Sequence, residues 1–212
     1  RAGGAYVLFL DSDDTLADGA LEKLRERLDW ADHPDVLVFD YARVHPGGTV
    51  DRHAKQDILS ALGDQVAGLR AYPGLLESRS VWNKAYRGEF LRQWGFSFPS
   101  GYYEDIPWTC MTLIAAHTIA GLALDLVYYR QHGSSILHTP SRRHFDVFGQ
   151  YDRTFAFLDE QPRFVEMRPA VHLCMVDHLE KIGRAGDRIP ADAVAEFHLV
   201  AEEWIRKHAP PG

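Results

Sequence analysis

Three aspartates near the start of the chain are the residues whose types and spacing are best suited to chemistry. Asp11, Asp13 and Asp14 come directly after residues 6–10, a short apolar run typical of a strand buried on both faces. Sheets built from such strands place their ligand crevices at the carboxyl ends of the strands. Carboxylates this close repel one another unless a cation neutralises them, so the sequence predicts a hard divalent cation here. The alternative is a solvated acidic turn in which Asp14 or Thr15 only caps the next element.

A second acidic pair follows in the middle of the chain. Pro107 suits an early position in a helix, so Glu104 and Asp105 are expected at the entrance of a helix that runs to about His117. At that place Asp105 is either a catalytic carboxylate or a helix N-cap.

Two enzyme families share the local pattern of residues 10–16. Haloacid-dehalogenase-like phosphatases have a hydrophobic strand followed by Asp-x-Asp-x-Thr-Leu, which would make Asp11 a nucleophile that forms an aspartyl phosphate and Asp13 a general acid/base. Family 2 glycosyltransferases of the GT-A fold have a strand that ends in an Asp-x-Asp metal motif. There Asp13 would bind the metal on a sugar-nucleotide diphosphate, and Asp11 would help through the nucleotide or a metal-bound water.

The rest of the chain favours the second resemblance. The phosphatases need a lysine and a further acidic pair at the ends of later strands, but residues 186–192, the only similar string, follow a helical pattern and are predicted to form an interhelical turn. Residues 2–14 resemble the glycosyltransferases' run into the metal motif, and residues 82–87 resemble their Asn-Lys-aromatic segment. The Glu-Asp motif is matched by residues 103–105, and the closing aromatic-Arg-x-x-x-Ser segment by residues 128–136. These four landmarks occur in the family's order.

The resemblance implies a mechanism and assigns residues to it. A base opposite the leaving diphosphate implies direct displacement with inversion, and Asp105 matches that base. Asp11, Asp13 and His132 would hold Mn²⁺ or Mg²⁺. The residues that the resemblance places at the substrate are Trp82, Lys84, Glu104, Arg130 and Ser134.

Local patterns predict the elements that must position these side chains. The first part is expected to be α/β, a partial GT-A fold, with strands at 6–10, 36–44, 119–124 and 127–130 and helices at 18–28 and 88–94. Weak helical patterns lie between residues 57 and 76. After Pro140 three amphipathic stripes predict helices only. The predicted domains are therefore residues 1–139, the acceptor-side part of the catalytic domain, and residues 140–212, a helical region.

Composition narrows the classes of protein. The 212 residues are 46% hydrophobic and 25% charged, with a net charge of −7, which excludes global disorder and argues against nucleic acid as a partner. Two cysteines, Cys110 and Cys174, predict buried thiols in a reducing compartment. The longest apolar region, residues 113–129, carries His117 and Asp125 and is too interrupted to span a bilayer.

The start of the chain and one further string bear on the biological setting. There is no initial Met, and the family's nucleotide-binding half does not precede the metal motif, which predicts a truncated enzyme that is inactive by itself. Residues 129–137 and 143–146 resemble bacterial proteins that join a family 2 glycosyltransferase to a CDP-glycerol glycerophosphotransferase. That resemblance implies a UDP-sugar donor, a glycan or polyol-phosphate acceptor, and cell-wall or teichoic-acid synthesis in the cytoplasm or at the inner face of the plasma membrane. A non-catalytic α/β assembly module remains a further alternative.

Overall fold

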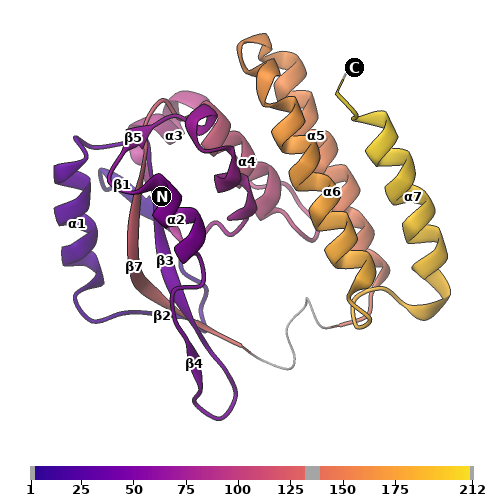
Figure 1. The fold of residues 1–212 in the computed structure, drawn as a ribbon, viewed down its shortest axis with the longest axis horizontal. Helices are drawn as coiled ribbons and strands as arrows, with labels where there is room; N and C mark the ends of the chain where they lie inside the picture. The colour runs from indigo at the N-terminus through magenta and orange to yellow at the C-terminus, as the bar shows by residue number, and fades with distance from the viewer. Residues whose placement is uncertain (1–2, 132–138, 211–212) are drawn as a thin grey trace. The chain divides into compact units, whose positions relative to one another are not determined.

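A seven-stranded sheet organises the first part of the chain in the computed structural model, which describes residues 3–131 and 139–210 (Figure 1). The strands are β1 (Tyr6–Leu8), β2 (Thr15–Leu16), β3 (Val36–Val44), β4 (Val50–Asp51), β5 (Val66–Ala67), β6 (Lys84–Arg87) and β7 (Ile119–Arg130). Their main path runs β1-β6-β3-β7-β2, with β4 paired to β3 and β5 paired to β7. Among the described strands, β3 and β7 pair in parallel and the other pairs are antiparallel.

The helices divide between the sheet and a separate helical group. They are α1 (Ala20–Trp30), α2 (Gln56–Leu62), α3 (Gly88–Trp94), α4 (Asp105–Ala115), α5 (Asp146–Glu160), α6 (Arg168–Arg184) and α7 (Val194–Lys207). Helices α1 and α2 both contact β7, whereas α6 contacts both α5 and α7. Within the described residues, no helix has both the length and the apolar character that crossing a membrane requires.

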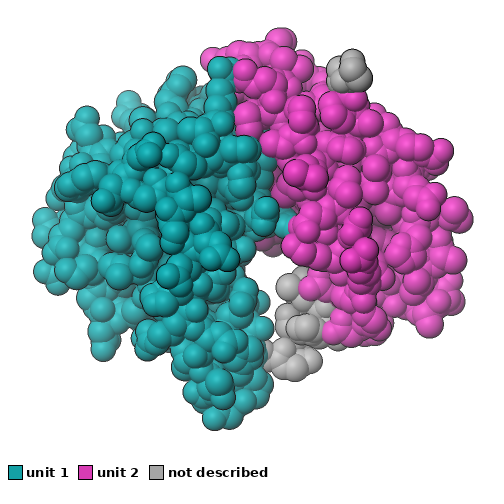
Figure 2. All heavy atoms as spheres, in the orientation of Figure 1, with its two compact units in different colours: residues 1–96, 112–132 teal, residues 97–111, 133–212 magenta. Residues whose placement is uncertain are grey.

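The chain forms two units, coloured separately in Figure 2: residues 1–96 with 112–132, and residues 97–111 with 133–212. The first contains the sheet, and the second contains α5 to α7 together with residues 97–111, which include the first part of α4. The predicted division into residues 1–139 and 140–212 describes where a catalytic domain ends, whereas these units describe which residues pack together. The predicted division therefore stays a prediction.

A buried carboxylate holds the strands of the first unit in register. Asp35 lies just before β3, and its Oδ2 accepts hydrogen bonds from the backbone N–H of His117, at 2.8 Å, and of Thr118, at 3.3 Å. Its Oδ1 accepts from the guanidinium of Arg87 at the end of β6. These bonds tie the beginnings of β3 and β7 to β6. The positions of the opposite ends of β3 and β7 relative to each other are therefore fixed as well.

Most of the predicted elements are confirmed, and the departures have physical causes. The strand at 36–44 and the helix at 88–94 have the predicted bounds. β1 is only half-buried, because it is an edge strand paired with β6 alone among the described residues, so the prediction of burial on both faces is wrong. Residues 119–130 form one strand instead of two, because β7 pairs with β3 along its length. The pairing shifts register on both sides of Asp40, and these bulges keep the strand continuous. Residues 57–76 contain a short helix, a strand and two 3-10 helices.

Helix ends and the C-terminal region add further detail. The first helix was predicted to begin at residue 18, but it begins at Ala20, and its N-cap is Gly19, whose φ of 71° lies in the left-handed region that glycine adopts readily. Ser141 caps the 3-10 helix Arg142–Phe145, because its Oγ accepts from the Arg143 N–H at 3.2 Å. Residues 186–192 lie between α6 and α7, which confirms the predicted interhelical turn. Both cysteines are buried and reduced.

Candidate functional site

Residues 11–14, called the acidic turn below, lie between β1 and β2. Strand β2 pairs with the second half of β7. The Asp14 N–H donates to the Asp11 carbonyl oxygen at 3.1 Å, which closes the turn. Asp11 and Asp13 are exposed, whereas Asp14 is 6% exposed. The turn therefore presents two carboxylates to solvent and buries the third.

Asp14 anchors this turn to the end of β7. Its Oδ1 accepts from the backbone N–H of Arg130 at 2.9 Å, and its buried Oδ2 has no hydrogen-bond partner within residues 3–131 and 139–210. Burial raises the pKa of Asp14 most, and the negative charges of Asp13 and Asp11 raise it further, although the hydrogen bond from Arg130 opposes them. The sequence groups Asp14 with Asp11 and Asp13 or makes it a local cap, and gives no sign that it is bonded to the end of β7.

An aromatic triad lies beside the acidic turn. The rings of Trp82 and Tyr129 stack with centroids 4.9 Å apart, and the ring of Tyr41 meets Trp82 edge-on at 4.6 Å. Burial raises the pKa of Tyr129, and the charges of Asp14 and Asp11 raise it as well, so the phenol lies near the turn. The sequence identified Trp82 but not Tyr41 or Tyr129, because only the pairing of β3 with β7 brings these three rings together.

Lys84 supports the loop that carries Trp82. It is fully buried, and its Nζ donates to the carbonyl oxygens of Ser78 and Ser80, each at 2.6 Å, and to Asn83 Oδ1 at 2.8 Å. In this arrangement the ammonium holds residues 78–83 in place. Contact between Lys84 and a substrate phosphate, which the resemblance implied, stays a prediction.

The predicted residues at the end of β7 are only partly described. The Arg130 side chain is exposed, while its backbone N–H holds Asp14. His132 and Ser134 lie outside the described residues. The sequence therefore predicted correctly that Arg130 lies at the end of a strand. The structure adds that the backbone N–H of Arg130 supports the acidic turn.

In the second unit, a tyrosine–histidine pair fixes the backbone just before Glu104 and Asp105. Tyr103 has a φ of 62°, and its hydroxyl lies 2.6 Å from His144 Nδ1. His144 Nε2 lies 3.2 Å from the carbonyl oxygen of Thr139, which accepts only, so Nε2 carries the hydrogen and Nδ1 accepts from Tyr103. Burial lowers the pKa of His144 and raises that of Tyr103 to about 12, so both remain neutral near pH 7.

The two acidic residues of this segment have different surroundings. Glu104 is exposed and Asp105 is half-buried as the first residue of α4. A carboxylate at a helix N-terminus is favoured by the helix dipole, which agrees with both interpretations of Asp105, the base and the cap. The sequence assigned His144 no role, because the bond that Tyr103 makes with it spans 41 positions.

The donor atoms of the acidic turn fit a hard cation. Asp11 and Asp13 offer oxygen ligands only, and exposed carboxylates can be approached from solvent. Across residues 3–131 and 139–210, however, the group of three side chains that could hold a metal lies elsewhere, at Asp40, His53 and Asp125. No local sequence pattern indicates this group, because its members are far apart along the chain.

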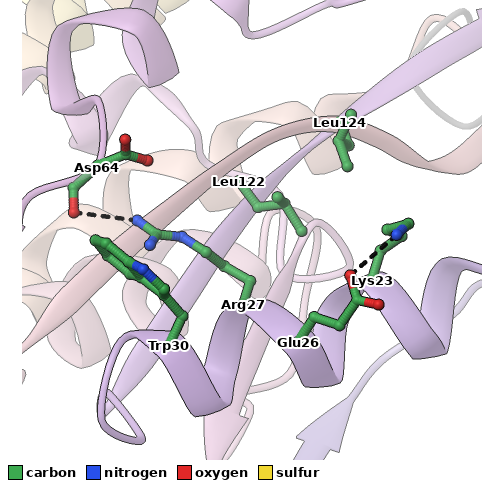
Figure 3. Close-up of a pocket in the computed structure, with 7 residues that line it drawn as sticks. All are labelled: Lys23, Glu26, Arg27, Trp30, Asp64, Leu122 and Leu124. Carbon is green, nitrogen blue, oxygen red and sulfur yellow. Dashed lines mark hydrogen bonds and ion pairs between the residues drawn. The ribbon is translucent and has the colours of Figure 1, made fainter.

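A hollow between α1 and β7 is the surface feature shown in Figure 3. Its lining residues are Lys23, Glu26, Arg27, Trp30, Asp64, Leu122 and Leu124. Arg27 reaches from α1 to the carbonyl oxygens of Gly121, at 2.7 Å, and Asp64, at 3.3 Å, so its role is to attach the helix to the sheet. None of the predicted site residues lines this hollow.

Comparison with known proteins shows the fold. No family model and no curated protein matches the sequence. Among solved structures, S. aureus TarS residues 1–349 in complex with UDP-GlcNAc is 19% identical, with a TM-score of 0.51 over 98% of this chain and 66% of that one. The same region in complex with UDP is 20% identical, with a TM-score of 0.51 over 98% and 65%. The chain thus spans slightly less than two thirds of these structures.

The longer S. aureus TarS structure is 18% identical, with a TM-score of 0.51, and this chain covers 39% of it. The likeness confirms the predicted fold class: an α/β chain with a partial GT-A fold followed by C-terminal helices.

Proposed function

We propose that this chain is the acceptor-side part of an inverting, divalent-metal-dependent family 2 glycosyltransferase. The observation that carries the proposal is the likeness over 98% of the chain to S. aureus TarS in complex with UDP-GlcNAc. The acidic turn after β1, with two exposed carboxylates and a buried anchor, gives that fold a place for a cation and a diphosphate.

The proposal includes a donor, which the same comparison supports, and an acceptor. TarS structures contain UDP-GlcNAc and UDP, which supports a uridine sugar nucleotide as the donor. The acceptor is a hydroxyl of a glycan or polyol phosphate, in bacterial cell-wall or teichoic-acid synthesis at the cytoplasmic face of the membrane. The association with a CDP-glycerol glycerophosphotransferase remains part of this proposal.

The residues of the acidic turn would neutralise the leaving group. Asp11 and Asp13 would hold Mn²⁺ or Mg²⁺, which supplies positive charge to the departing diphosphate. Asp14 keeps the turn at the end of β7 through the Arg130 N–H. Trp82, stacked on Tyr129, would form an apolar wall for the sugar.

Asp105 would be the catalytic base. Asp105 at the start of α4 would accept the proton of the acceptor hydroxyl as that oxygen attacks the anomeric carbon. Displacement in one step by an oxygen on the face opposite the diphosphate inverts the anomeric configuration. Glu104 is exposed beside it and would contact the acceptor.

The test uses the protein at its full natural length. Asp105→Asn should lower the rate of sugar transfer by about 10²–10⁴-fold, the usual contribution of a general base, while UDP binding is kept. Asp13→Asn should abolish the manganese dependence of UDP binding. Asp18→Asn, which changes an exposed aspartate shortly after the turn, is the matched control and should alter neither.

Other outcomes would replace the proposal. Transfer at the normal rate by Asp105→Asn would remove the base assignment. Trapping of an aspartyl-phosphate analogue at Asp11 by beryllium fluoride would favour the phosphatase, and absence of any sugar-nucleotide binding would favour a non-catalytic module.

A further inference from the structure

Two buried carboxylates face each other across the parallel pair of β3 and β7. Asp40 on β3 lies opposite Asp125 on β7, and the register shifts on both sides of Asp40. Such bulges re-aim side chains and occur often next to functional sites. Like charges opposite each other in a sheet destabilise it. The strand irregularity thus brings together two groups that a regular ladder would avoid pairing.

The hydrogen bonds of Asp40 leave one oxygen unused. Its Oδ1 accepts from the backbone N–H of Tyr41, at 2.8 Å, and of Lys55, at 2.7 Å. The residue is fully buried, and its Oδ2 has no hydrogen-bond partner among the residues that the structure describes. A buried acceptor without a partner destabilises the fold, and an incoming cation would remove that cost.

Asp125 repeats this arrangement. Its side chain is 5% exposed, and its Oδ1 accepts from the His53 N–H at 3.0 Å. Within the described part of the chain the buried Oδ2 makes no hydrogen bond, although the Arg52 guanidinium lies 3.5 Å away. Arg52 supplies one positive charge for two carboxylates, so its presence leaves the pair with excess negative charge.

His53 adds a nitrogen ligand that is open to solvent. Its Nδ1 lies 3.6 Å from Asp125 Oδ1, and the residue is exposed. One ligand atom each from Asp40, His53 and Asp125 lies within 4.8 Å of the other two. The exposed imidazole provides both an entry path and the freedom to close on an ion.

We propose that Asp40, His53 and Asp125 form a site for a divalent transition cation of the zinc class. Two carboxylates with one imidazole are a mixed oxygen and nitrogen set, which suits Zn²⁺ better than Mg²⁺ or Ca²⁺, whose ligands are oxygens. Three protein ligands leave a fourth position for water or a substrate. The site shares no residue with the acidic turn, so it is separate from the cation of the proposed glycosyltransferase.

The experiment measures Zn²⁺ binding to the chelator-treated chain by isothermal titration, with thermal unfolding as a second readout. We expect one Zn²⁺ per chain and a Zn²⁺-dependent rise in the unfolding temperature. Asp125→Asn and His53→Gln should each weaken Zn²⁺ binding by about tenfold or more. Loss of a residue that only hydrogen-bonds to a metal ligand already has an effect of about this size, and loss of the ligand itself should have a larger one. His53 is exposed, so His53→Gln leaves the fold intact.

Two control variants isolate the site. His45→Gln changes an exposed histidine whose Nε2 lies 2.7 Å from Asp51 Oδ2, a pair on the same hairpin, and should leave binding unchanged. Asp13→Asn should also leave it unchanged, which separates this site from the acidic turn.

Three results would overturn the proposal. These are absence of stoichiometric Zn²⁺ binding, binding that is insensitive to both His53→Gln and Asp125→Asn, or tighter binding of Mg²⁺ than of Zn²⁺. Asp40→Asn addresses the competing explanation, a proton shared by the carboxylates, because asparagine keeps the Oδ1 acceptor. A more stable Asp40→Asn variant, with no Zn²⁺ effect on the original chain, would establish the shared proton instead.

Discussion

Replacing Lys84 with methionine tests whether this lysine supports the Trp82 loop or contacts a substrate. Methionine has a similar length but cannot donate a hydrogen bond. The change removes the close bonds from Nζ to Ser78, Ser80 and Asn83, at 2.6, 2.6 and 2.8 Å, and leaves their buried acceptors without this donor.

The expected loss of stability can be worked from these contacts. Three hydrogen bonds to a charged group, at about 1.5 kcal/mol each as a lower value, give about 4–5 kcal/mol. The variant no longer buries an ammonium ion, and this relief offsets part of the loss. We therefore expect Lys84→Met to lower the free energy of unfolding by about 3 kcal/mol, a large fraction of the usual 5–15 kcal/mol.

Urea unfolding followed by far-UV circular dichroism measures this change, with the slope against urea checked for constancy. Lys181→Met is the matched control: Lys181 is 62% exposed and forms an i,i+4 pair with Asp177, so its loss should cost less than about 0.5 kcal/mol. A change below about 1 kcal/mol for Lys84→Met would refute the supporting role. Weaker donor binding at unchanged stability would identify a phosphate contact instead.

Three further predictions concern other parts of the structure. Asp35→Asn should lower the free energy of unfolding by about 3 kcal/mol, because the buried carboxylate holds three donors; equal urea midpoints would contradict this. Gly149→Ala should stabilise the protein by up to about 1 kcal/mol, because Gly149 lies in a helix and no described atom lies within 4 Å of the added Cβ. Gly88→Ala should destabilise the protein, because backbone oxygens would lie 3.0 and 3.3 Å from the added Cβ. Thermal unfolding of the two variants measures both effects. Burial lowers the pKa of His144 and His208 from the usual 6.5, so the unfolded chain binds more protons just below that pH. Stability should therefore be fully present above pH 6.5 and fall as the pH is lowered through it, and a flat unfolding temperature from pH 7.5 to 5.5 would refute this.

Several features could be predicted because they depend on neighbours along the chain. The bounds of the strand Val36–Val44 and the helix Gly88–Trp94 follow from apolar runs, helix-forming residues and a terminal glycine, Gly95, with a φ of 66°. The acidic turn was recognised from its position after an apolar run, and Asp105 from the proline two residues later. These signals are local, so no knowledge of the rest of the fold was required.

The remaining features join residues that are distant in sequence. Asp14 receives the Arg130 N–H across 116 positions, and Tyr103 meets His144 across 41. The opposition of Asp40 and Asp125 depends on bulges in a parallel strand pair, which no periodicity reveals.

The sequence by itself determined the α/β class, the main elements and the two acidic motifs. Tertiary structure decided which aspartates are buried, that Lys84 supports a loop, and that Asp40, His53 and Asp125 lie close together. The reason is physical: secondary structure reflects short-range sterics and hydrophobic periodicity, whereas burial and charge environment depend on which strands pair and in which register.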